Sequence, residues 1–166
     1  MRATAAETKR QVSVVRLEPW NGRELRRFFF RLSPETLYRR FLSPIARPEQ
    51  ARPALLLDLD HQNREALAGV VDGEIVGVAR YARRPGSDAA DVAIVVADAW
   101  QRQGVGMILL RALGKAASAA GIRSFTVLMH ADNRPALALV RRLQPAARLA
   151  LSDGLYEGVL PLPWAS

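Results

Sequence analysis

The segment Val96-Ala97-Asp98-Ala99-Trp100-Gln101-Arg102-Gln103-Gly104-Val105-Gly106-Met107 carries the features that decide the fold. An apolar strand pattern enters a loop with two glycines, and the loop leads directly into a helical pattern. The first N–H groups of a helix have no intrahelical acceptor, and the helix dipole favours negative charge at that end. Glycines without a Cβ also let an anion approach the main chain. The segment therefore predicts a binding loop for an anion such as a pyrophosphate.

The glycine spacing distinguishes this loop from two common nucleotide-binding loops. Gly104-x-Gly106 lacks the third glycine of a dinucleotide fingerprint, and no Gly-Lys-Ser/Thr follows as in a P-loop. An isolated Gly-x-Gly also occurs in ordinary tight turns between a strand and a helix. The loop alone leaves both interpretations open.

The periodicity of the whole chain predicts one sheet with helices inserted between its strands. Before the loop it predicts a strand, two helices, a hairpin and a strand, at 11–17, 21–32, 33–42, 65–81 and 91–97. Asp72-Gly73 supplies the hairpin turn. After the loop it predicts a helix, a strand, a helix and two strands, at 104–121, 124–129, 133–143, 148–151 and 156–160. This order indicates a mixed α/β or α+β architecture.

The long helix after the loop has an apolar stripe and a glycine stop. Gly121 is placed to end the helix. The stripe predicted to face the core is Val105, Ile108, Leu109, Ala112, Ala116 and Ala120.

Gln101-x-x-Gly104-x-Gly106, five residues after Val96, resembles the acetyl-CoA pyrophosphate motif of the GNAT acyltransferase superfamily. The predicted element order matches that fold, so the resemblance covers nearly the whole chain. It implies a GNAT fold, with a mixed central sheet of about seven strands splayed at strand four and about four helices. Residues 11–166 would form this single domain, after a flexible tail at 1–10.

Three further segments resemble the catalytic domain of bacterial protein lysine acetyltransferases of the Pat type. They are 73–81, 90–96 and 133–135. This resemblance implies acetyl-CoA as acyl donor and a primary amine as acceptor, most closely a protein lysine ε-amine such as one on an acyl-CoA synthetase. Two alternatives stay open: an acetyltransferase for a small-molecule amine, and a catalytically weak module that binds CoA or associates with nucleic acid.

The resemblance also implies site residues. The strand end at Val95, Val96 and Ala97 would bond the pantetheine and hold the thioester carbonyl. Residues at the loop and at the start of the later helix would hold the rest of the cofactor: Gln101, Arg102, Gln103, Gly104, Val105, Gly106, Met107 and Asn133.

The subgroup's general-base glutamate falls at Asp91, which is one methylene shorter. The tyrosine that protonates the leaving thiolate in many GNAT enzymes is replaced by Val140. A base is needed because a lysine with a pKa near 10.4 is only about 0.1% neutral near pH 7.4, a deficit of roughly 4 kcal/mol. Period-two alternation puts Asp91 on the same strand face as Ala93, Val95 and Ala97. His130 is the alternative base.

Composition and charge exclude several other classes. The net charge is +8, and all but two of the 24 basic residues are arginines, scattered singly or in pairs. No platform of aromatics and glycines accompanies them, which argues against a nucleic-acid module and favours a surface that attracts anions. The absence of cysteine excludes disulfides and thiolate ligands, and two histidines argue against a metal site.

The chain also lacks the patterns of a membrane or secreted protein. Charged residues interrupt every apolar run before the roughly 18–20 residues of a membrane span. The first ten residues contain no apolar signal core. We therefore expect a cytoplasmic protein, either a monomer or a homodimer.

Overall fold

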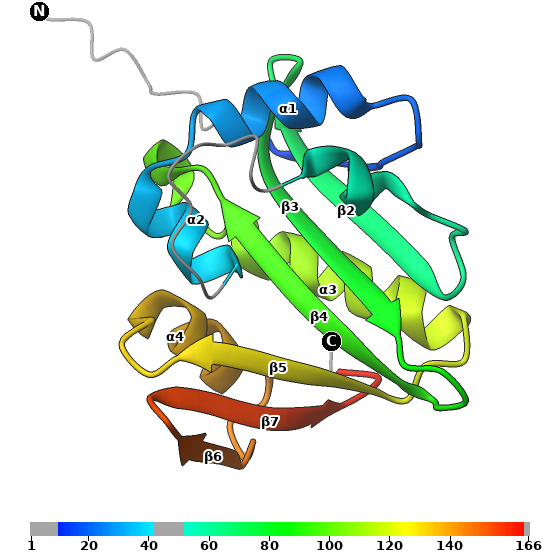
Figure 1. The fold of residues 1–166 in the computed structure, drawn as a ribbon, viewed down its shortest axis with the longest axis vertical. Coiled ribbons are helices and arrows are strands. Elements are labelled where there is room, and N and C mark those ends of the chain that lie inside the picture. The colour runs from blue at the N-terminus through cyan, green and yellow to red at the C-terminus, as the bar shows by residue number, and fades with distance from the viewer. Residues whose placement is uncertain (1–9, 42–51, 165–166) are drawn as a thin grey trace, which may run out of the picture.

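Seven strands form one mixed sheet in the order β1-β2-β3-β4-β5-β7-β6 (Figure 1). The computed structural model describes residues 10–41 and 52–164. The strands are β1 (Ser13–Arg16), β2 (Arg64–Val71), β3 (Glu74–Arg83), β4 (Ala89–Val96), β5 (Ser124–His130), β6 (Leu149–Ser152) and β7 (Leu155–Pro161). The helices are α1 (Gly22–Phe30), α2 (Pro34–Phe41), α3 (Val105–Ala119) and α4 (Arg134–Leu143), with short 3₁₀ turns η2 (Pro53–Leu57) and η3 (Asp98–Trp100). The predicted fold class and element order are confirmed.

The sheet splits between β4 and β5. These two are the only parallel neighbours among the described strands, and they pair only at Ala89–Asp91 against Ser124–Thr126. Beyond Asp91 and Thr126 the two strands diverge, so the backbone edges that face each other there have no ladder partner. This is the splay predicted at strand four, and it opens a V-shaped gap in the sheet.

Helices cover both faces of the sheet (Figure 1). One apolar cluster joins α1, α2 and η2 to the sheet face that carries Val78 and Val95. A second joins α3 and α4 to the opposite face, which carries Ala79 and Phe125. Each face of β4 therefore points into a different cluster, and Val95 belongs to the α1/α2 side.

The hairpin of β2 and β3 turns where the sequence predicts it. Asp72 and Gly73 both have positive φ, 49° and 78°, as a type I′ turn requires. The predicted tail at 1–10 lies, apart from Arg10, outside the described residues, so that prediction stays untested. No helix in the described ranges is both long enough and apolar enough to cross a membrane.

His61 joins two carboxylates at the start of β2. Its Nδ1 lies 2.9 Å from Oε1 of Glu65, and its Nε2 lies 2.9 Å from Oε2 of Glu18. Hydrogen bonds to Glu65 and then to Glu18 raise the pKa of His61 above its ordinary value. Because Glu65 is almost fully buried, the charged imidazole stabilises a carboxylate that water does not reach.

We expect this cluster to make stability fall as the pH rises. A raised pKa in the folded state gives stabilisation that is complete below the unfolded pKa of about 6.5. That stabilisation is lost as the pH rises through the folded pKa. The Tm should therefore drop by a few degrees between mildly acidic and mildly alkaline buffer. In His61→Gln this drop should be smaller, and in the neighbouring exposed control Gln62→Ala it should persist. Equal slopes in wild type and His61→Gln would contradict the assignment.

Candidate active site

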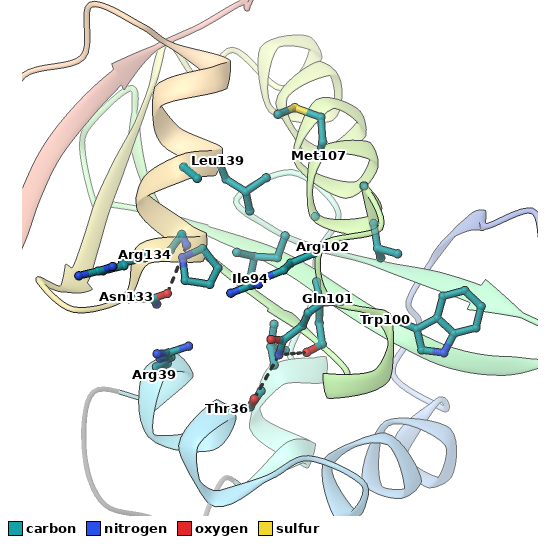
Figure 2. Close-up of a pocket in the computed structure, with 18 of the residues that line it drawn as sticks. Thr36, Arg39, Ile94, Trp100, Gln101, Arg102, Met107, Asn133, Arg134 and Leu139 are labelled. Carbon is teal, nitrogen blue, oxygen red and sulfur yellow. Dashed lines mark hydrogen bonds between the residues drawn. The ribbon is translucent and has the colours of Figure 1, made fainter.

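A cleft of about 520 Å³ lies where β4 ends and α3 begins, with α2 and α4 on its other sides (Figure 2). The end of β4 contributes Val95 and Val96, and the loop and the first turn of α3 contribute Gln101, Arg102, Gly104, Val105, Gly106 and Met107. Asn133 lines it from the start of α4. The structure thus brings most of the sequence-predicted cofactor residues together around one cavity.

The start of α3 presents free backbone donors to this cleft. Gly104 is the N-cap residue with φ of 84°, a left-handed conformation that glycine adopts at no steric cost. The first bond closing α3 runs from the N–H of Ile108 to the carbonyl of Gly104, at 3.1 Å. The N–H groups of Val105, Gly106 and Met107 therefore have no acceptor within the helix, which is the arrangement that binds an anion.

The charge of the cleft matches an anionic ligand. The arginines that line it come from α2, the loop and α4, and none of the described lining residues is acidic; the arginines are Arg39, Arg40, Arg102, Arg134 and Arg142. Figure 2 shows Arg39, Arg102 and Arg134 placed around the cavity from these three elements. Positive side chains at a helix N-terminus add to its dipole, so the cleft fits a group that carries several phosphates.

The loop is held to α2 by a carboxylate. Asp98 accepts hydrogen bonds from the backbone N–H and Oγ of Ser33, at 3.0 and 2.6 Å, and from Oγ1 of Thr36 at 2.8 Å. Burial alone would raise the pKa of Asp98, but these hydrogen bonds outweigh it and hold the pKa below its usual range. Gln101 adds bonds from Nε2 to the Val96 carbonyl, at 3.0 Å, and to Thr36, at 3.2 Å (Figure 2). These bonds fix the loop before any ligand arrives.

Two of the predicted cofactor residues do not line the cleft. The N–H of Ala97 donates to the carbonyl of Val76 on β3, at 2.8 Å, so it is not free to bond a ligand. Backbone direction alternates along a strand, so Ile94 and Val96 instead turn their amides toward the open side of the V. Gln103 is exposed and donates from Nε2 to the Ala99 carbonyl, at 2.8 Å, which stabilises the loop from outside.

Asp91 lies at the vertex of the V, outside the cleft lining. It is the last β4 residue paired with β5, and its side chain is 60% exposed. Arg84 holds it through Nε and Nη2, each 2.9 Å from Oδ1. Val96 is the fifth residue after Asp91, about 16 Å away along an extended strand. A base at Asp91 therefore requires a cofactor whose reactive end reaches down the gap between the strands.

His130 occupies the other arm of the V, at the end of β5. Its ring stacks on Tyr38 of α2, with the centroids 4.5 Å apart. Its Nε2 is buried and has no hydrogen-bond partner among the described residues. His130 thus faces the α2 side of the gap, whereas Val140 is a buried residue of α4.

The sequence did not identify several of the residues that line the cleft. They are Thr36, Arg39 and Arg40 from α2, Trp100 from η3, and Arg134, Leu139 and Arg142 from α4. The arginines at 134 and 142, eight positions apart on one predicted helix, were the available signal for the α4 set. Nothing local could identify the α2 set, because α2 reaches the cleft through tertiary contacts, such as those of Thr36 with Asp98 and Gln101. Among the described residues, no group of His, Asp or Glu side chains, the cluster at His61 included, is arranged to hold a metal ion.

The chain was compared with protein families and known proteins. Residues 24–144 match the acetyltransferase (GNAT) family model. The chain is similar to acetyltransferase PA5475 of Pseudomonas aeruginosa, with 37% identity over 116 residues, which is 66% of this chain and 61% of the relative. It is also similar to acetyltransferase Pat of Mycolicibacterium smegmatis, with 32% identity over 115 residues, 67% of this chain and 34% of that protein. The chain therefore spans less than two thirds of the length of these relatives.

The structure resembles the GNAT domain of the PAT protein from S. lividans, with a TM-score of 0.83 and 25% identity over 91% of this chain and 90% of that one. The fold also matches yncA of Salmonella typhimurium, solved with its cofactor acetyl-CoA, with a TM-score of 0.68 and 15% identity over 92% and 94% of the two chains. The resemblance to Pat-type catalytic domains is confirmed, and the family that matches is one of acetyltransferases. With its splayed sheet and the free amides at the start of α3, the chain belongs to the GNAT acetyltransferase family.

Proposed function

We propose that the chain transfers an acetyl group from acetyl-CoA to a lysine ε-amine on the surface of another protein. The observation that supports this acceptor is the open sheet face at the vertex of the V. Asp91, Thr126 and Val159 lie in one row across β4, β5 and β7, because each pairs with the next in register. Asp91 is 60% exposed and Val159 55%, while Thr126 between them is buried at 8%. The exposed Asp91 at the edge of this row suits a side chain presented by a large partner rather than an enclosed small molecule.

Acetyl-CoA, the acyl donor, is held by two parts of the cleft, the start of α3 and the open edge of β4. The amides of Val105, Gly106 and Met107 and the surrounding arginines bind the pyrophosphate. The pantetheine arm runs along the open edge of β4, where the amide of Val96 bonds it. The amide of Ile94, three residues or about 10 Å from Asp91, polarises the thioester carbonyl. Asn133 accepts a hydrogen bond from the N–H of Ala136, at 3.2 Å, so its main role in this proposal is to cap α4 beside the cofactor.

Asp91 is the general base of the proposed reaction. Arg84 holds its carboxylate in place at the vertex, where it can accept a proton from the incoming lysine, directly or through one water. The neutral amine then forms a C–N bond to the acetyl carbon as the C–S bond breaks. The thiolate leaves without a dedicated acid, because Val140 replaces the tyrosine of other members.

Competing acceptors test this assignment. We expect kcat/KM for lysines on a folded acyl-CoA synthetase, or on peptides from its surface, to exceed that for polyamines and aminoglycosides by at least about tenfold. Intact mass before and after reaction counts the acetyl groups, and lysine-to-arginine substitution in the acceptor is the control. A small amine that turns over far faster than any protein lysine would contradict the proposed acceptor but not acetyl-CoA binding. If the protein transferred no acetyl group but bound nucleic acid tightly and in a salt-sensitive way, it would be a binding module and not an enzyme.

A further inference from the structure

A smaller cavity of about 90 Å³ adjoins the main cleft between the diverging strands β4 and β5. We call it the side pocket. Its polar lining residues are Arg39, Arg40 and Asn133, and all three also line the main cleft. Every described residue that lines only the side pocket is apolar, and those that are almost fully buried are Leu110, Val127, Met129, Val140, Leu143 and Leu160. The side pocket is therefore an apolar branch of the cleft, with its polar groups at the junction.

The side pocket begins where the thioester is proposed to lie. Ile94, whose amide would polarise the thioester carbonyl, lines both spaces (Figure 2). Val92, two residues or about 7 Å nearer to the vertex of the V, lines only the side pocket. The pantetheine arm enters from the phosphate end at Val96, so the acyl group is the part of the donor that lies deepest in the gap. Carbons beyond the thioester carbonyl therefore continue toward the side pocket.

The two faces of β4 separate the acyl chain from the amine. Val92 and Ile94 pack against the apolar cluster of α3 and α4, whereas Val95 belongs to the cluster of α1 and α2. Period-two alternation puts Asp91 on the same face as Val95. The amine thus approaches the carbonyl from the side of the base, and the acyl chain lies on the opposite side. A longer chain in the side pocket does not block the base.

The size and lining of the side pocket fit a short alkyl chain. A water molecule takes up about 30 Å³ in the liquid, so 90 Å³ holds about three groups of that size, which is close to the size of a methyl or methylene group. A cavity lined by apolar side chains stays dry and binds apolar ligands. Close packing of the buried wall residues fixes the shape of the pocket before a ligand arrives. Val140 helps to keep the space open, because a larger side chain at this position would grow into it.

We propose that the side pocket takes the alkyl chain of a straight acyl group of three or four carbons, so that propionyl-CoA and butyryl-CoA are better donors than acetyl-CoA. This rests on the proposed function, because it takes the thioester to lie at Ile94. The bond changes are those of acetyl transfer. The C–N bond forms, the C–S bond breaks, the amine proton passes to Asp91 and the thiolate leaves.

Donor affinities test the side pocket without any acceptor. Burying one methylene group strengthens binding about fourfold. Calorimetry should therefore give a Kd about fourfold lower for propionyl-CoA than for acetyl-CoA, and at least about tenfold lower for butyryl-CoA. Octanoyl-CoA should bind no more tightly than butyryl-CoA, because its chain exceeds the space. With a lysine peptide as acceptor, kcat/KM should be at least about threefold higher for propionyl-CoA than for acetyl-CoA.

Two variants fill the side pocket from different elements, so the test survives if one of them fails to fold. Val140→Phe fills it from α4 and Val92→Phe from β4, and phenylalanine adds bulk without adding an acid. Each variant should reduce the preference for butyryl-CoA over acetyl-CoA to within about twofold. Each should keep the Kd of free CoA within about threefold. The control Val15→Phe makes the same change on the edge strand β1, where the side chain is 42% exposed, and should keep the preference.

The outcomes distinguish the side pocket from the proposed acceptor. If no lysine is acylated with any donor, the proposed function fails, and the Kd values still test the side pocket. Equal Kd values for acetyl-CoA, propionyl-CoA and butyryl-CoA overturn the inference, and so does a folded Val140→Phe variant that keeps the preference. Affinity that keeps rising to octanoyl-CoA would indicate an open apolar surface instead. Loss of free CoA binding in both filled variants also overturns the inference, because the pantetheine arm would then occupy the pocket.

Discussion

Asp91→Asn should lower kcat by about 10²–10⁴ and leave the affinity for acetyl-CoA nearly unchanged. Losing a positioned general base typically costs that much rate. Asparagine has nearly the same shape but cannot accept the amine proton. Because Asp91 lies outside the cleft lining, at the vertex of the V, the substitution should not disturb the cofactor contacts. Steady-state kinetics and calorimetry on the same preparation separate the two effects.

Two further variants sharpen this test. Asp91→Glu restores the longer carboxylate of the related subgroup and should retain or raise kcat. Asp88→Asn removes an equally exposed carboxylate, paired with Arg123 at 3.8 Å just before β4, and should change kcat little. Normal turnover by Asp91→Asn across mildly acidic to mildly alkaline pH would contradict the assignment. The base would then be sought at His130, whose buried Nε2 lacks a partner among the described residues.

The fold was predictable because its signals are local. Ser33 and Pro34 mark the start of α2, Asp72-Gly73 the β2–β3 turn, and Gly104 and Gly121 the two ends of α3. Each of these positions depends on a backbone conformation or a cap that only a few residue types supply. The strand order was predictable only through the family resemblance, since nothing local says that β7 lies between β5 and β6.

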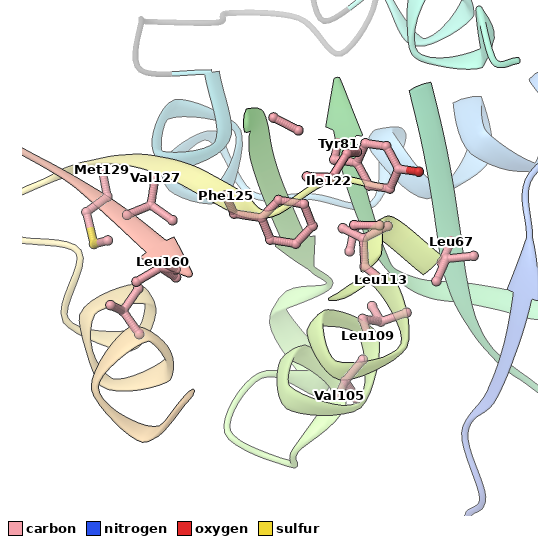
Figure 3. Close-up of a cluster of buried hydrophobic side chains, with 14 of the residues drawn as sticks. Leu67, Tyr81, Val105, Leu109, Leu113, Ile122, Phe125, Val127, Met129 and Leu160 are labelled. Atoms are coloured by element: carbon pink, nitrogen blue, oxygen red, sulfur yellow. The ribbon is translucent and has the colours of Figure 1, made fainter. Parts of the chain in front are cut away.

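The buried stripe of α3 was predicted only in part. Leu109 and Val105 are buried as expected, but Ile108 is 43% exposed. The buried positions continue instead through Leu113 to Ala117, and Figure 3 shows Val105, Leu109 and Leu113 facing Phe125 and Leu67 across the core. The apolar pattern of the sequence favoured a stripe rich in alanine. Alanine is apolar but small, so it fits both the buried and the exposed face of the helix. Packing against large side chains of the sheet selects the leucines.

The charged contacts of the site were not predictable from sequence. Asp98 accepts hydrogen bonds from Thr36 and Ser33, which lie 62 and 65 positions earlier in the chain. Period and spacing say which face a residue occupies but not which distant group it meets. The hydrogen bond of the Ala97 amide was unpredictable for the same reason, because its acceptor is Val76 on a neighbouring strand.

Gly106→Glu should weaken acetyl-CoA binding at least about tenfold, or about 1.4 kcal/mol. A Cβ at Gly106 would lie 2.9 Å from Cδ1 of Leu139 and 3.5 Å from Cδ1 of Ile94, and both residues line the cleft. A longer side chain at this position therefore grows into the cavity between α3 and α4. Its carboxylate would stand beside the free amides of the helix start, where the pyrophosphate is proposed to bind.

Two controls separate this blockage from loss of folding and from charge alone. Gly106→Ala should keep most of the affinity, because the terminal methyl of Leu139 can rotate away from a single added carbon. Ile108→Glu adds the same charge to the same helix at a position 43% exposed and outside the cleft lining, so its Kd should change far less. If a folded Gly106→Glu variant bound acetyl-CoA with unchanged affinity, the start of α3 would not be part of the cofactor site. A loss as large in Ile108→Glu would instead attribute the effect to long-range repulsion, since only position 106 puts its side chain in the space that the phosphates need.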